Sequence, residues 1–310
     1  MEGNDGGVYA MAVYTNGTHI GKVIIAGSFT NFNRVARFGI ARLHPGGGLD
    51  TSFNPGTGIE DGTVYALAIQ DDGKIVVGGT FTTVQGAPRS GIARLNLNGM
   101  LDINFRPGTG ANGPVYAVAV QPDDKIVVGG AFTEMRGATR NGIARLTSEG
   151  SLDALTSFNP GNGAEGGVVN VLALQPDGKI LLGGDFTAVG GVPREGLARL
   201  QANGRLDPAF ATDSSAANLI WAIASLADGK VLVAGEFTTI GNESRDGIAR
   251  LDANGRVDAT FDPGLGLNVD HGEHVLAMAV QTNGSVVIGG TFEEVNNFYR
   301  PGLARLDITG

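Results

Sequence analysis

The sequence predicts an all-β protein, a six-bladed β-propeller with mostly four antiparallel strands per blade. Three observations lead to this fold class: a unit of 51 to 55 residues recurs six times, glycine accounts for 51 of the 310 residues, and no segment keeps a helical period of 3.6 residues. Average glycine usage is about 7%, so this roughly doubled share favours many turns that join short strands. A repeat of this length is typical of a propeller blade.

Each unit contains a Phe in the pattern small residue, Gly, any residue, Phe. These six residues are Phe29, Phe81, Phe132, Phe186, Phe237 and Phe292. Thirteen residues after each Phe, an Arg lies within a Gly-Ile/Leu-Ala-Arg-Leu string; the six are Arg42, Arg94, Arg145, Arg199, Arg250 and Arg305. The spacing from Phe to Arg is the same in all six units. We therefore predict one domain, residues 1–310, made of six blades.

The second unit illustrates the strands that we expect in every blade. Alternating and apolar segments bounded by turn residues predict strands at Thr63–Gln70, Lys74–Thr82, Gly91–Asn96 and Leu101–Phe105. Asp71-Asp72-Gly73 and Asn98-Gly99 predict tight turns, and Thr83–Ser90 is expected to be irregular. The last unit has no Leu-Asp-x-x-Phe segment before Gly310. Either blade six has three strands, or the sequence is an excerpt of a longer chain.

Positions shared by all copies are expected to serve the scaffold. The repeated Arg residues can pair with carboxylates, and we expect such pairs between blades. The repeated Asp residues that could take part are Asp50, Asp102, Asp153, Asp207 and Asp258. A recurring second-strand Gly indicates a bulge or a close backbone approach; the six are Gly27, Gly79, Gly130, Gly184, Gly235 and Gly290.

The motifs resemble two known repeat families. Hydrophobic residues running into Gly-Gly, as at Lys74–Gly79, resemble the kelch-type blade, without the later Tyr and Trp markers of kelch. The chain is more similar to the delta-60 repeat, also described as a β-propeller domain of unknown function, in the segments 175–179, 183–187, 194–200 and 203–207. This resemblance covers nearly the whole chain. It implies a module of a bacterial cell-surface or secreted protein, and it supplies no catalytic residues.

A unique site should lie where one copy departs from the others, and two departures stand out. The longest between-blade segment, 261–279, contains two of the four His residues. It is either a solvated insertion or a metal or ligand site, and its candidate binding residues are Asp270, His271, Glu273 and His274. Trp221 occupies a first-strand position that is Tyr in three other units. Its side chain either packs in the core or forms a stacking platform for a sugar ring.

Composition excludes several functions. A net charge of −9 gives no basic surface for nucleic acid. No apolar run approaches the roughly 18 residues of a membrane span, and the first residues contain no signal peptide. We therefore expect a monomer that neither binds nucleic acid nor inserts into a membrane. The resemblance places it at the cell surface or outside the cell.

The leading hypothesis is a non-enzymatic module that binds protein or glycan through its long-loop face, where the second-to-third and between-blade loops lie. The alternative is a propeller enzyme that hydrolyses or cleaves polysaccharide, with carboxylates on long loops. Its candidates are Glu60, Asp61, Glu165, Asp270 and Glu273, and none forms a recognisable catalytic motif. No cofactor is expected. A further option is a stabilising calcium ion bound by loop carboxylates and carbonyls.

Overall fold

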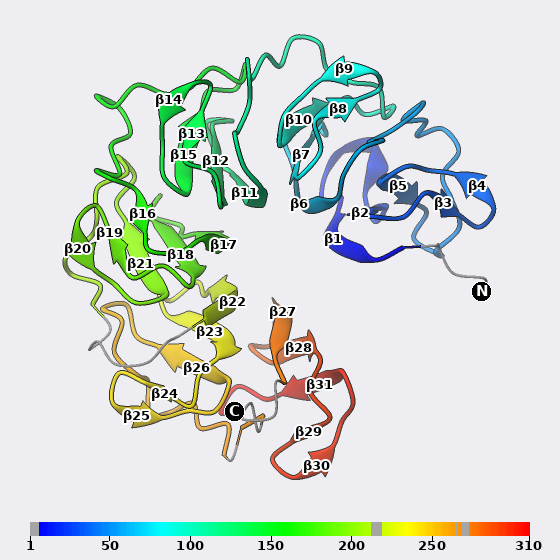
Figure 1. Cartoon of the computed structure of the whole chain (residues 1–310). Helices are drawn as coiled ribbons and strands as arrows, with labels where there is room; N and C mark the ends of the chain where they lie inside the picture. The colour runs from blue at the N-terminus through cyan, green and yellow to red at the C-terminus, as the bar shows by residue number, and fades with distance from the viewer. Residues whose placement is uncertain (1–5, 212–218, 265, 268–272) are drawn as a thin grey trace. The chain divides into compact units, whose positions relative to one another are not determined.

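The computed structural model describes residues 6–211, 219–264, 266–267 and 273–310. The chain forms two compact units, Met1–Ala154 and Leu155–Gly310. Each unit contains three blades, and the main sheet of every blade has three antiparallel strands (Figure 1). The six repeats predicted from the sequence are thus six blades of a β-propeller fold.

The first strand of each blade carries the alternating residues that the sequence indicated. These strands are β1 (Val8–Val13), β6 (Val64–Ile69), β11 (Val115–Val120), β17 (Val169–Leu174), β22 (Leu219–Ser225) and β27 (Val275–Val280). The second strands are more continuously apolar, and most are fully buried: β2 (Val23–Gly27), β7 (Ile75–Gly79), β12 (Ile126–Gly130), β18 (Ile180–Gly184), β23 (Val231–Glu236) and β28 (Val286–Gly290). The third strands carry the repeated Arg: β5 (Ile40–Leu43), β10 (Ile92–Leu95), β15 (Ile143–Leu146), β21 (Leu197–Leu200), β26 (Ile248–Leu251) and β31 (Leu303–Leu306).

The fourth segment of a blade is shorter than the sequence indicated. In each of the first five blades it joins the third strand through one antiparallel bridge, for example Leu95 with Leu101. Its remaining residues turn away, because Asp102 accepts a hydrogen bond from the Asn104 amide and so starts a turn.

The stretch between the second and third strands was expected to be irregular, and this expectation is wrong. It folds into a short hairpin in every blade: β3 (Asn31–Phe32) with β4 (Val35–Ala36), β8 (Thr83–Val84) with β9 (Ala87–Pro88), β13 (Glu134–Met135) with β14 (Ala138–Thr139), β19 (Ala188–Val189) with β20 (Val192–Pro193), β24 (Thr239–Ile240) with β25 (Glu243–Ser244), and β29 (Glu294–Val295) with β30 (Phe298–Tyr299). Strand β16 (Ala164–Glu165) adds to the β19–β20 hairpin. A short 3-10 turn, η1 (Gly17–His19), lies between β1 and β2.

The recurring second-strand glycine marks a close backbone approach. In blade two the register between β6 and β7 shifts between Val64 and Ala66, which is a bulge opposite the Gly78-Gly79 pair. A Cβ at Gly79 would collide with the carbonyl oxygen of Thr63. The same collision with a backbone carbonyl recurs at the equivalent glycines of the other five blades, so the bulge requires this residue type.

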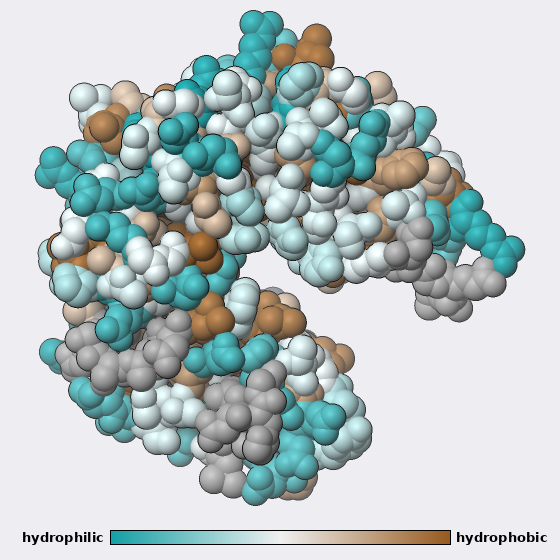
Figure 2. Space-filling model, in the orientation of Figure 1, coloured by the Kyte–Doolittle hydropathy of each residue, from teal (hydrophilic) through white to brown (hydrophobic). Residues whose placement is uncertain are grey.

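Within each unit, the hydrophobic core lies between consecutive blades. Ile24 and Phe53 of blade one share a buried cluster with Val77 and Phe81 of blade two, and blades five and six share another. On the face shown in Figure 2 the surface is mostly hydrophilic, and hydrophobic side chains gather beside β22 and β27. In the part of the chain that the structure describes, no helix is long and apolar enough to cross a membrane.

Candidate binding site

At Arg42, Arg94, Arg199 and Arg250 the repeated Arg of the third strand links its blade to the next blade of the same unit. Arg94 shows the arrangement: its Nε lies 2.9 Å from Asp102 Oδ2 in its own blade, and its guanidinium stacks on the Phe105 ring at 4.9 Å. Its Nη1 reaches the next blade and donates to the carbonyl oxygen of Ser148 at 2.5 Å. The Arg side chain is therefore buried with its charge paired and its Nε and Nη1 donors bonded.

The Arg–Asp pairs lie within a blade, so the expectation of pairs between blades is wrong. The Nε to Oδ2 distances are 2.8 Å for Arg42 and Asp50, 2.9 Å for Arg94 and Asp102, 2.8 Å for Arg145 and Asp153, 2.9 Å for Arg199 and Asp207, and 2.8 Å for Arg250 and Asp258. The contact between blades is instead a hydrogen bond from Nη1 to a backbone carbonyl, on Leu97, Ser148, Ala253 or Ile308. Arg305 is exposed, and among the described residues no carboxylate lies against it.

A second link between blades comes from the residue that directly follows the first strand. In blade two this is Gln70, whose Oε1 accepts from Arg94 Nη1 at 3.2 Å and whose Nε2 donates to Asp124 Oδ1 of blade three at 3.2 Å. In blade four Gln175 accepts from Arg199 Nη1 at 3.4 Å and donates to the carbonyl oxygen of Gly229 at 3.4 Å. A carboxamide therefore connects the Arg of one blade to the first turn of the next.

Blade one achieves the same connection with a different side chain. The Tyr14 hydroxyl donates to the carbonyl oxygen of Gly73 in blade two at 3.1 Å. Blade five departs from the pattern, because the equivalent residue is Leu226. A leucine side chain has neither donor nor acceptor, so it makes neither of these two hydrogen bonds.

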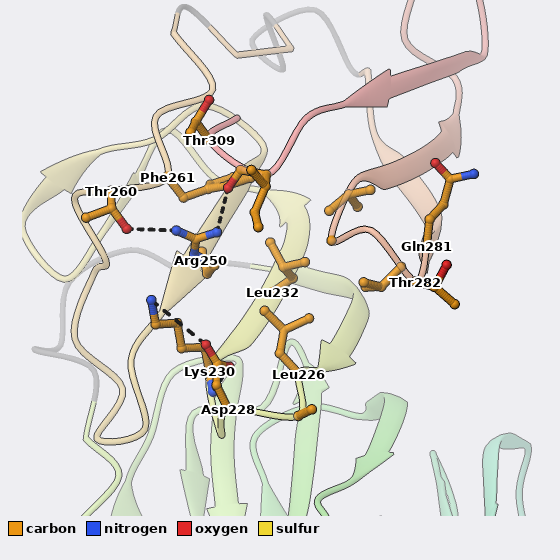
Figure 3. Close-up of a pocket in the computed structure, with 15 residues that line it drawn as sticks. Leu226, Asp228, Lys230, Leu232, Arg250, Thr260, Phe261, Gln281, Thr282 and Thr309 are labelled. Atoms are coloured by element: carbon orange, nitrogen blue, oxygen red, sulfur yellow. Dashed lines mark hydrogen bonds and ion pairs between the residues drawn. The ribbon is translucent and has the colours of Figure 1, made fainter.

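A cavity of about 560 Å³ lies at this departure, between blades five and six (Figure 3). Leu226, Leu232 and Phe261 supply apolar wall from blade five, and Gln281 and Thr282 face them from blade six. Pockets that hold small ligands commonly measure about 300–1,000 Å³, with mostly apolar walls and a few polar groups. This cavity has both properties, and it is the candidate binding site.

The charges around the cavity are paired. Asp258 accepts from Arg250 Nε at 2.8 Å and lies 2.8 Å from Lys230 Nζ. Burial alone would raise the pKa of the Asp258 carboxyl, but hydrogen bonds from Lys230, Thr260 and Arg250 together hold it well below its usual range. The carboxylate is therefore ionised at neutral pH, and it offsets one of the two cations.

The cavity opens on the short-turn face. Its walls include the first-to-second turns of blades five and six, at 226–230 and 281–284, and the turn after the third strand of blade six at 308–309. Loop length alone favoured the opposite, long-loop face. Leu226, which stands where blades two and four have Gln70 and Gln175, lines the cavity. A search for the copy that departs at this position would have led to it.

Trp221 lies in β22 and is half-buried. Its Nε1 is buried, and it finds no acceptor among the described residues. The equivalent residues of blades one to three are tyrosines, and each contacts the tyrosine of the neighbouring blade. The ring centroids are 5.5 Å apart for Tyr9 with Tyr65 and for Tyr65 with Tyr116. Trp221 does not line the cavity, so the choice between core packing and sugar stacking stays a prediction.

The predicted loop site is only partly described. Asp270 and His271 lie outside the described residues. Glu273 Oε2 accepts from the Glu293 amide at 3.1 Å, and His274 Nδ1 lies 3.7 Å from Glu236 Oε1. No group of three or more His, Asp or Glu side chains that could hold a metal ion occurs in the described ranges.

Two of the proposed catalytic carboxylates bind backbone amides in their own surroundings. Asp61 Oδ1 accepts from the amides of Thr82 and Thr83, both at 3.1 Å. Glu165 Oε1 accepts from the Gly191 amide at 2.6 Å. Glu60 is exposed. The two bonded carboxylates thus hold the hairpins that follow the second strands.

Known structures with a similar fold come from several bacterial proteins. A catalytically inactive virginiamycin B lyase from Staphylococcus aureus, in complex with quinupristin, is 18% identical with a TM-score of 0.55, and the match covers 99% of this chain and 86% of that one. PorZ, described as a surface component of the type-IX secretion system of Porphyromonas gingivalis, is 14% identical with a TM-score of 0.55, over 90% of this chain and 37% of that one.

The extracellular domain of a B. thetaiotaomicron protein described as a one-component system is 14% identical with a TM-score of 0.53. That match covers 96% of this chain and 32% of the other, so this chain spans about a third of its length. At these identities the likeness shows the β-propeller fold alone. No curated protein matches the chain by sequence.

A family match covers well over half of the chain. It recurs six times, over residues 21–53, 70–105, 121–155, 175–210, 226–261 and 281–309. The expected resemblance to a β-propeller domain of unknown function is thereby confirmed, whereas the delta-60 and kelch comparisons stay expectations. The chain belongs to the family described as "Domain of unknown function (DUF5122) beta-propeller".

Proposed function

We propose that the chain is a non-enzymatic binding module of a larger bacterial cell-surface or secreted protein, and that its ligand enters the cavity between blades five and six. The observation that carries this proposal is Leu226: among the residues that directly follow the first strands of blades one to five, it is the one whose side chain has no hydrogen-bonding group. A repeat scaffold uses its shared positions for packing, so a cavity at a departing position favours a specific ligand.

The placement at the surface rests on the proteins of similar fold. PorZ is described as a bacterial surface component, and the B. thetaiotaomicron domain as extracellular. Protein and carbohydrate are the two ligand classes expected from the sequence. The long-loop face remains a second candidate surface for a large partner.

The test is binding of the 310-residue chain to arrays of glycans and of peptides, repeated with two variants. Leu226→Gln restores the side chain that the cavity lacks, and Trp221→Ala removes the predicted stacking platform. We expect a saturable hit that Leu226→Gln abolishes and Trp221→Ala preserves. A hit lost only in Trp221→Ala would move the site to the first strands and contradict the cavity.

The alternative function, a polysaccharide hydrolase or lyase, is separated from binding by a turnover assay. Incubation of the chain with any polysaccharide that it binds should release neither reducing ends nor unsaturated products. Turnover that Asp61→Asn or Glu165→Gln removes would favour the enzyme.

A further inference from the structure

We propose that the cavity between blades five and six binds a small molecule that carries a primary carboxamide on a short aliphatic stem. The inference deepens the proposed function and rests on it for the choice of site. It follows from what fills the same position at the other described interfaces between blades.

The first step is the donor that Leu226 leaves free. In blades two and four, Arg Nη1 donates both to the Gln carboxamide and to a carbonyl of the next blade. In blade five, and within the described residues, Arg250 Nη1 donates to the Ile308 carbonyl at 2.8 Å without the Gln acceptor. A second N–H of this nitrogen is therefore available. Arg250 itself is 8% exposed and lines the cavity, so an acceptor placed there would gain a charge-assisted hydrogen bond.

The second step is the acceptor on the opposite wall. The Gln175 amide nitrogen donates to the carbonyl oxygen of Gly229, in the first turn of the next blade. The equivalent residue of blade six is Gly284, which also lines the cavity. Among the described residues no side chain of blade five donates to its carbonyl. The cavity thus offers one donor and one acceptor, and a carboxamide joins the equivalent two groups at the blade four–five interface.

The third step is charge. Arg250 is paired with Asp258, which also pairs with Lys230, and Asp228 lies 4.0 Å from Lys230. Two cations therefore face two anions. A carboxylate would accept from Arg250, but it would place a negative charge beside the Gly284 carbonyl. A neutral carboxamide matches both groups, because it carries an acceptor and a donor on one carbon.

The fourth step is the stem. Leu226, Leu232 and Phe261, with Val280 and Ile308, make the wall predominantly apolar. Burial of each methylene contributes about 0.8 kcal/mol, so an aliphatic stem adds affinity to a carboxamide head. The cavity volume of about 560 Å³ accommodates a stem of several carbons.

The probe that tests this inference is pentanamide, with pentanoate, pentylamine and 1-pentanol as analogues of equal length. The readout is the set of methyl resonances of Leu226, Leu232 and Ile308 in methyl-labelled protein, followed during titration. Leu226→Gln supplies the missing carboxamide from the chain itself. Leu226→Met is the matched control, because it keeps the volume and leaves both polar groups free.

We expect saturable shifts with pentanamide in the natural protein and in Leu226→Met, and none at the Leu232 and Ile308 methyls in Leu226→Gln. Pentanamide should bind at least about tenfold more tightly than pentylamine, which corresponds to about 1.4 kcal/mol. Equal shifts with all four probes, binding that survives Leu226→Gln, or no shift in the natural protein would each overturn the inference.

The two proposals fail separately. If the arrays give a hit that Leu226→Gln abolishes while pentanamide does not bind, the cavity is a site for another ligand class. If pentanamide binds while the arrays are blank, the carboxamide site stands and the protein or glycan function does not.

Discussion

Arg94 Nη1 donates a hydrogen bond of 2.5 Å to the carbonyl oxygen of Ser148, which lies 54 residues further along the chain in the next blade. The same guanidinium pairs with Asp102 of its own blade at 2.9 Å. One side chain therefore connects the third strand of a blade to the fourth segment of the same blade and also to the next blade. The same two contacts recur at Arg42, Arg199 and Arg250, which explains why these copies keep an Arg at the same spacing from the Phe.

Arg94→Ala should be strongly destabilising. The change leaves the Asp102 carboxylate, which is 3% exposed, without its guanidinium partner and with Lys74 Nζ at 3.7 Å as the remaining cation; breaking one side of a buried pair commonly costs about 3–5 kcal/mol. The free energy of unfolding, measured with urea, should fall by that amount. Arg305→Ala is the matched control, because Arg305 holds the same repeat position but is exposed. Equal losses in the two variants would contradict the structural role of the pair.

Gly79→Ala should destabilise through a backbone collision. The added Cβ would meet the carbonyl oxygen of Thr63, and rigid backbone on both sides leaves little room for relaxation, so we expect a loss of about 1–3 kcal/mol. Gly46→Ala is the control, because Gly46 has open space around it and a backbone that suits an L-residue. It should leave the urea midpoint unchanged or slightly raised. A tolerated Gly79→Ala would argue against the bulge as described.

The sequence predicted the blades well and the binding site poorly, for physical reasons. The strands around Phe81 and the Arg94 position were recognisable, because the same residue types recur at the same spacing in six copies that pack in the same way. The hairpin at Thr83–Pro88 was missed, because strands of two residues are too short to show a period. The position of the Arg–Asp pairs was wrong, because spacing along the chain does not say which blade supplies a carboxylate.

The cavity was missed for a different reason. Leu226 directly follows an apolar strand, and a leucine there looks ordinary by itself. It becomes informative only by comparison with Gln70 and Gln175 at the equivalent position, whose carboxamides hydrogen-bond to groups of two blades. A sequence position that is polar in the other copies and apolar in one copy is the signal that leads to this site.

Stability should decline in acid in a way that depends on Asp258. Burial opposes ionisation of this carboxyl, but hydrogen bonds from Lys230, Thr260 and Arg250 lower its pKa in the folded protein. The unfolded chain has an Asp pKa of about 3.9. The folded pKa is the lower one, so the stabilisation is complete above about pH 5 and is lost as the pH falls toward the folded pKa.

Asp258→Asn should therefore flatten the dependence of the free energy of unfolding on pH between about pH 5 and pH 2. Thr260→Val removes the hydroxyl donor that lies 2.7 Å from Asp258 Oδ1, and it should give an intermediate slope. Urea unfolding at a series of pH values measures all three slopes. An Asp258→Asn slope identical to that of the natural protein would show that other carboxyls govern the acid response.

Gln70→Leu should reproduce in blade two the situation of blade five. Gln70 is 3% exposed, and its carboxamide joins Arg94 Nη1 to Asp124 Oδ1. Loss of two buried hydrogen bonds, partly offset by a more apolar side chain, should lower the free energy of unfolding by about 1–2 kcal/mol. Gln281→Leu is the control, because this Gln holds the same position in blade six and is exposed; its change should be small. If a missing carboxamide is what makes the blade five–six cavity a site, Gln70→Leu should also gain saturable methyl shifts with pentanamide at Val76 and Val120, which pack together between blades two and three. A destabilised variant without new binding would limit the carboxamide site to the particular walls of blades five and six.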